Sequence, residues 1–127
     1  MKSQEAVEVA LVKIEEIDSA GYQLNSVLSI SDDALDQARN YDVAGNDLPL
    51  QGLPILLKDN IEAKGLPATA GSLALADTPV IHDSPIAKTL REAGAIIIGA
   101  TNLSEWANIR STKSTSGWSA VGGLTAN

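Results

Sequence analysis

Lys58 stands where an apolar segment meets a polar one, in the string Gly52-Leu53-Pro54-Ile55-Leu56-Leu57-Lys58-Asp59-Asn60. Most lysines are solvated surface charges, but a lysine whose amine is neutral can act as a base. The ordinary lysine pKa is about 10.4, so neutrality near pH 7 requires a depression of about 3 units, or roughly 4 kcal/mol. We expect apolar burial to supply that depression, and the Asp59 carboxylate to point away and bond backbone amides.

Two buried strands with a helix between them are predicted to position Lys58. The near-continuous apolar run Leu53–Leu57 indicates a strand buried on both faces, and Ala95–Ile98 indicates a second one. Between them Ser84 is an N-cap, followed by Pro85 at the first helical position, and Gly94 ends the helix. A strand, a helix and a strand with short connections form a right-handed crossover, so the two strands are expected to be parallel.

The carboxyl ends of parallel strands meet at one edge of a sheet, where ligands collect. Lys58 and the pair Thr101-Asn102 each follow one of these strands. The sequence therefore predicts that they share one rim.

The remaining segments predict further α/β structure. We expect a helix over Ser3–Asp18 ended by Gly21, a strand over Leu24–Ile30, a helix capped by Ser31, a short helix over Gly71–Ala76 with Pro79 closing that region, and a flexible loop or tail over residues 111–127.

Composition limits the classes of function. The 127 residues are 44% hydrophobic with four aromatics and no Phe, which suits one domain with an aliphatic α/β core. A net charge of −7 with scattered lysines and arginines argues against a nucleic-acid partner. With no Cys and a single His, His82, which we interpret as a surface loop residue, we expect no metal and no cofactor. Neither a leader nor a membrane span is visible, so we expect a cytoplasmic location and no membrane partner.

Five further blocks follow the Lys58 string in order along the chain. They are Ala70-Gly71-Ser72, Asp83-Ser84-Pro85, the stretch Arg91–Gly99, the stretch Thr101–Ala107 and the stretch Gly122–Asn127. Together with the Lys58 string they resemble the amidase signature family, whose members cleave carboxamide C–N bonds with a Ser, a second Ser bearing a cis peptide bond, and a Lys base. The resemblance implies that Lys58 is the base and that the fold is the N-terminal part of the family's mixed-sheet α/β/α fold.

Two strings are most similar to the peptide amidase branch of the family, which removes C-terminal amides from peptides. They are Ser104-Glu105-Trp106-Ala107-Asn108 and Ser116-Gly117-Trp118-Ser119. The resemblance implies a small amide or a peptide amide as substrate.

The resemblance also implies roles for residues around Lys58. The family braces its site loops at the positions of Asp59, Asn60, Thr101, Asn102 and Glu105, although direct substrate contact is the alternative for them. It lines its substrate funnel at the positions of Arg110, Ser114, Thr115 and Ser116, which by residue type alone are a solvated loop.

In the family, a Gly/Ser-rich segment that carries both serines follows a Thr-x-Asn such as Thr125-Ala126-Asn127, and residues 1–127 contain no such run. We therefore expect residues 1–127 to be an incomplete N-terminal segment of one amidase domain, with the nucleophile segment beyond residue 127. Such a segment would be inactive alone, its partner would be the remainder of the amidase chain, and unpaired strand edges would favour self-association. The alternative is a non-enzymatic α/β interaction or complementation fragment.

Overall fold

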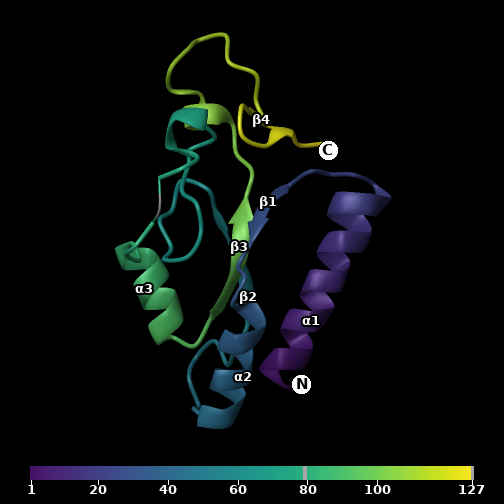
Figure 1. Ribbon diagram of the computed structural model, residues 1–127, viewed down its shortest axis with the longest axis vertical. Coiled ribbons are helices and arrows are strands. Elements are labelled where there is room, and N and C mark those ends of the chain that lie inside the picture. The colour runs from purple at the N-terminus through teal and green to yellow at the C-terminus, as the bar shows by residue number, and fades with distance from the viewer. Residues whose placement is uncertain (79, 127) are drawn as a thin grey trace.

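The computed structural model describes residues 1–78 and 80–126, in which a small sheet has helices on both faces (Figure 1). Helices α1 and α2 cover one face and α3 lies on the other, so the order of layers is α/β/α. The elements are α1 (Ser3–Lys13), a π-helix (Ile14–Gly21), β1 (Val27–Ile30), α2 (Ala34–Ala44), β2 (Pro54–Lys58), a 3₁₀ turn (Leu73–Leu75), α3 (Pro85–Glu92), β3 (Ile96–Thr101), a second 3₁₀ turn (Glu105–Asn108), β4 (Trp118–Ser119) and β5 (Gly123–Leu124).

The main sheet is mixed, with strand order β1-β3-β2. Strand β2 runs parallel to β3, which confirms the predicted parallel pairing, and β1 runs antiparallel to β3. Gly99 of β3 lies at a close approach, since an added Cβ would collide with the carbonyl oxygen of Ser29. The mixed sheet between helices confirms the expected α/β class.

Strand β3 supplies both cores because its side chains alternate between the faces. Ile96 and Ile98 pack with Val7 of α1 and with α2, while Ile97 packs with Ala87 of α3. All three isoleucines are buried. The expectation of burial on both faces therefore holds for β3.

Strand β2 differs from that expectation, because Pro54, Ile55 and Leu56 are only half-buried. Within the described residues β2 lies at the edge of the sheet, paired only with β3. An apolar run alone does not distinguish an edge strand from a central one.

Three local predictions need correction. Ser31 is not the N-cap of α2, because its hydroxyl donates to Asp33 Oδ1 at 2.5 Å and Asp33 holds the cap position. The helix expected over 71–76 is a single 3₁₀ turn. Residues 111–127 are not simply a tail, since they contain the β4–β5 hairpin. Pro79 and Asn127 lie outside the described residues.

Residues 1–78 and 80–126 contain no helix with the length and apolar character that a bilayer crossing requires. The same part of the chain contains no group of three or more His, Cys, Asp or Glu side chains arranged to hold a metal ion.

Candidate active site

Lys58 and Thr101 lie opposite each other where β2 and β3 end. The amide of Asp59 donates to the carbonyl oxygen of Thr101 at 3.1 Å, so the ladder continues one step beyond the strand. The Thr101 hydroxyl donates to the carbonyl oxygen of Leu57 at 3.4 Å. The fold thus brings the predicted base and the predicted Thr101 to one rim.

The Lys58 side chain is exposed. We expected its apolar neighbours to bury the amine, and within the described residues they do not. Ile55 and Leu57 pack into the core on the α3 side, and Leu56 packs into the core on the α1 side. These side chains point into the layers below the rim, so any burial of the amine must come from another surface.

Asp59, in contrast, is completely buried. Its Oδ2 accepts hydrogen bonds from the Thr69 amide, at 3.2 Å, and from the Thr69 hydroxyl, and that hydroxyl accepts from the Gly71 amide at 3.0 Å. No ion pair joins Asp59 to Lys58 among the described residues, and the carboxylate bonds a backbone amide as expected.

The second carboxylate oxygen of Asp59, Oδ1, is buried without a hydrogen-bond partner in the part of the chain that the structure describes. Burial raises the pKa of the Asp59 carboxyl, and the hydrogen bonds from Thr69, together with the nearby amide of Gly71, offset this rise only in part. Asp59, a buried carboxyl with one oxygen that lacks a hydrogen-bond partner among the described residues, therefore lies next to Lys58 in the chain.

The loop held by Asp59 connects the rim to two later segments. The Trp106 amide donates to the carbonyl oxygen of Ala70 at 2.8 Å, and the Val121 amide donates to that of Gly71 at 3.2 Å. Gly71 has a φ of +77°, and an added Cβ would lie 2.6 Å from the Cβ of Ser119. Only glycine fits this junction, which seats the hairpin against the loop.

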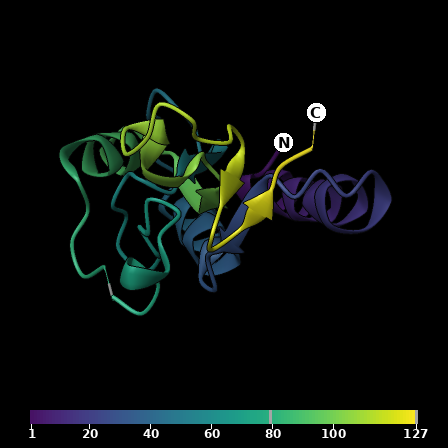
Figure 2. The same ribbon diagram turned by 90° about the horizontal axis from the view of Figure 1, so that it is seen from above.

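Asn102 and Glu105, two predicted scaffold residues, bond the β4–β5 hairpin, which lies above the end of the sheet (Figure 2). The Asn102 amide nitrogen donates to the carbonyl oxygen of Gly123 and to the Thr125 hydroxyl, both at 3.0 Å, and its oxygen accepts from Ser119 at 2.7 Å. Glu105 Oε2 accepts from the Ala120 amide at 2.9 Å.

Asn60, also predicted as scaffold, is exposed. Contacts like those of Asn102 and Glu105 are what a bracing role requires, and that role remains a prediction for all five scaffold residues.

Three of the four predicted substrate-binding residues line one cleft. The cleft has a volume of about 230 Å³ and contains Arg110, Ser114 and Thr115. Ser116 is not among its lining residues and instead accepts a hydrogen bond from the Asn108 amide nitrogen at 3.1 Å. Lys58 does not line the cleft either.

Sequence reasoning did not select the other side chains that line this cleft as binding residues. They are Trp106, Asn108 and Trp118, and the scaffold residue Glu105 lies there too. The sequence did contain a signal for the two tryptophans, because each lies in one of the two strings most similar to peptide amidase.

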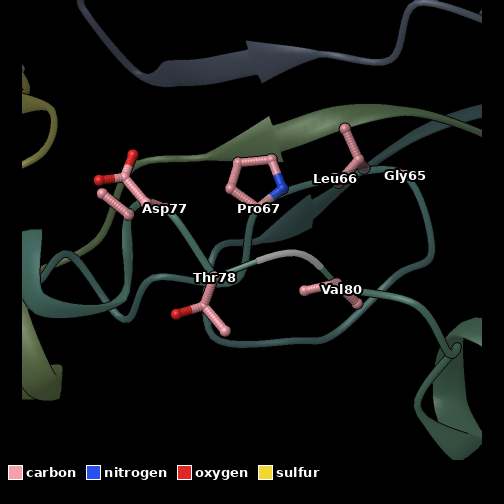
Figure 3. Close-up of a pocket in the computed structure, with 7 residues that line it drawn as sticks. Gly65, Leu66, Pro67, Asp77, Thr78 and Val80 are labelled. Atoms are coloured by element: carbon pink, nitrogen blue, oxygen red, sulfur yellow. The ribbon is translucent and has the colours of Figure 1, made fainter.

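A separate cavity of about 310 Å³ lies beside the 65–67 loop (Figure 3). Among the described residues Asp77 is the only ionisable one that lines it, with Gly65 at the opposite end (Figure 3). No predicted site residue contributes to the described lining, so we assign this cavity no role.

The fold and the rim define an α/β chain that presents a lysine at the carboxyl end of a parallel strand. A family model described as Amidase matches residues 5–127. The chain therefore belongs to the amidase family.

Individual relatives agree with this membership. A probable amidase from Arabidopsis thaliana is 42% identical over 96% of this chain and 25% of its own length. A glutamyl-tRNA(Gln) amidotransferase subunit from Methanosarcina acetivorans is 39% identical over 89% of this chain and 23% of its own length. The crystal structure of native peptide amidase from Stenotrophomonas maltophilia is 43% identical and superposes with a TM-score of 0.95 over all of this chain and 27% of its own.

The chain thus spans about a quarter of the length of the proteins it matches. Its structure corresponds to the N-terminal part of the amidase fold, which confirms the fold expected from the resemblance.

Proposed function

We propose that this chain supplies the base, Lys58, of a Ser-cisSer-Lys amidase site whose two serines lie on residues outside Met1–Asn127. The observation that carries this proposal is the exposed Lys58 amine at the carboxyl end of β2, beside Thr101 and above a loop fixed by buried Asp59. A surface that carries the serines can cover an amine in this position.

The chemistry requires such a base. A serine hydroxyl attacks an amide carbon only when it can pass its proton to a neighbouring group. Lys58 takes that role when neutral, with the cis-peptide serine passing the proton between the nucleophile and the amine. Covering the rim with an apolar surface excludes water and favours the neutral amine.

We further propose C-terminal peptide amides as the substrate class. Similarity to the peptide amidase of S. maltophilia supports this choice, and so does the cleft that gathers Arg110, Ser114 and Thr115 next to the hairpin. The remainder of an amidase domain is the partner that this proposal requires.

The test expresses the chain together with whatever its coding sequence specifies after Asn127 and measures ammonia release from small amides and peptide amides. Lys58→Ala is expected to lower kcat/KM by about 10²–10⁴-fold, the usual contribution of a general base. Lys64→Ala, which removes another exposed lysine, is the matched control and should leave the rate unchanged. Turnover that survives Lys58→Ala would show that Lys58 is not the base.

A second candidate function is a non-enzymatic module that docks or complements another chain. Within the described residues β1 and β2 each pair with β3 alone, so each leaves one edge free. Free edges promote strand addition by a second chain. Light scattering distinguishes the cases, because concentration-independent monomers would argue against docking through these edges.

A further inference from the structure

The cleft beside the hairpin is built on a strained turn. Trp106 and Ala107 have φ values of 50° and 51°, and Asn108 follows with 63°. Three successive non-glycine residues in the left-handed region are rare, and such strain concentrates at ligand clamps and active sites. The bond from the Trp106 amide to Ala70 fixes this turn to the loop held by Asp59. The strain therefore sits where the turn meets the cleft.

The volume of the cleft limits what it can hold. At about 230 Å³ it falls below the range of about 300–1,000 Å³ that is typical of pockets for whole small molecules. One side chain of a larger ligand is the appropriate size. The cleft therefore suits a subsite rather than a complete binding pocket.

The charges in the cleft narrow the class of that side chain. Glu105 lies on its wall and would repel an acidic group, while Arg110 would repel a basic one. Arg110 forms no ion pair among the described residues. Both tryptophans line the cleft, and Trp118 is 43% exposed, so a ligand can cover indole surface there. Aromatic pairs gain more than their buried area alone provides.

We propose that this cleft is a subsite for an aromatic side chain of a peptide amide, with Trp106 and Trp118 contacting the ring and Arg110 donating to a carbonyl oxygen of the same peptide. This proposal rests on the proposed function in taking a peptide amide as the ligand. It goes further in assigning the neutral aromatic class and the two tryptophans.

Intrinsic fluorescence gives a direct test, because the chain contains only two Trp residues and both line the cleft. The chain is titrated with N-acetylphenylalaninamide and, as a matched probe without the ring, with N-acetylglycinamide. The expected result is a saturable change in indole emission with the phenylalanine amide, half-complete at a concentration at least tenfold lower than for the glycine amide.

Two variants locate the contact. Arg110→Gln should weaken binding of the phenylalanine amide about fivefold, whereas Lys113→Gln, which removes an exposed cation from the same loop outside the cleft, should not change it. Equal responses to both variants would overturn the role of Arg110.

The binding test is independent of hydrolysis, since it needs neither Lys58 nor a serine. No saturable response to either amide, or equal responses to both, would overturn the aromatic subsite and leave the role of Lys58 standing. Conversely, selective binding together with full turnover of Lys58→Ala would support the subsite and refute the proposed base.

Discussion

Asp18 and Asp59 are both buried aspartates, but only Asp18 has hydrogen-bond partners for both carboxylate oxygens among the described residues. Asp18 closes the end of the π-helix onto β1: its Oδ1 accepts from the Ser26 amide at 2.7 Å and from the Ser26 hydroxyl, and its Oδ2 accepts from the Val27 amide at 3.0 Å. Asp59 uses one oxygen on Thr69, and its other oxygen has no partner among the described residues.

The pKa values of the two carboxyls shift accordingly. Burial by itself would raise the pKa of Asp18, but the hydrogen bonds from Ser26 and Val27 outweigh it and the pKa is lowered. Burial dominates at Asp59, and its pKa is raised. Asp18 is thus satisfied by its own neighbourhood, while Asp59 carries an uncompensated burial cost next to the proposed base. Perturbed and unsatisfied groups concentrate at functional sites. The contrast therefore distinguishes Asp18, whose bonds to Ser26 and Val27 form a structural clasp, from Asp59, whose role in the site remains a prediction.

Asp18→Asn is expected to lower the stability of the fold more than Asp59→Asn does. Asp18→Asn replaces one acceptor oxygen by a donor group that faces a backbone amide, and it removes the charge that strengthens the remaining bonds. The free energy of unfolding should fall by about 2–3 kcal/mol, since bonds to charged acceptors contribute about 1.5–3 kcal/mol and an unpaired buried donor adds a penalty. Urea unfolding at neutral pH measures this loss.

The control for Asp18 is Asp36→Asn. Asp36 pairs with Arg39 at 3.0 Å, but both side chains are exposed, so the change should stay within about 0.5 kcal/mol. If Asp18→Asn were equally mild, the clasp would not stabilise the fold.

The same substitution at Asp59 should have a smaller effect. In Asp59→Asn the amide oxygen can still accept from Thr69, and the buried charge is removed. The amide nitrogen takes the place of an oxygen that already lacks a partner among the described residues. We therefore expect the free energy of unfolding at pH 7 to change by less than about 1 kcal/mol.

Asp59→Asn also tests whether Asp59 serves Lys58. In the hydrolysis assay that tests the proposed function, the pH dependence of kcat/KM should shift although stability hardly changes. A large loss of stability would instead make Asp59 a second clasp and remove the contrast with Asp18.

Local sequence patterns predicted the parts of the fold whose signals are local. The run Ala95–Ile98 identified β3, and the pair Ser84-Pro85 placed the start of α3, where the Ser84 hydroxyl accepts from the Ala87 amide at 3.3 Å. The crossover rule then placed Lys58 beside Thr101. None of these inferences needed contacts between distant residues.

The missed features depend on distant partners. The β4–β5 hairpin has strands of only two residues, too short for a periodic pattern, and it is held by Asn102 and by Asn25, whose amide nitrogen donates to the Gly122 carbonyl oxygen at 2.6 Å. The exposure of Lys58 was missed because an apolar string does not tell which way its side chains point. Trp106 and Trp118 line the same cleft only in the folded structure, where Trp118 belongs to the hairpin.

The smallest effect, and the sharpest distinction between the two aspartates, is the pH dependence of the variants. The folded pKa of Asp18 lies below the unfolded value of about 3.9, so its stabilisation is present above about pH 4 and is lost as the pH falls through the folded value. The folded pKa of Asp59 lies above the unfolded value, so its charge destabilises the fold at neutral pH and this penalty disappears as the pH falls toward about 4.

Urea unfolding of the wild type and both Asn variants between about pH 7 and about pH 3 measures these differences. The deficit of Asp18→Asn should shrink only below about pH 4, whereas any advantage of Asp59→Asn should be greatest at pH 7 and decline before that point. Comparing each variant with the wild type cancels the contributions of Asp33 and Asp42, whose pKa values are also lowered by hydrogen bonds. If lowering the pH raised the stability of both variants relative to the wild type, or lowered the stability of both, the two carboxyls would not be in opposite environments. The unpartnered oxygen of Asp59 would then no longer distinguish the candidate site from Asp18 and its bonds to Ser26 and Val27.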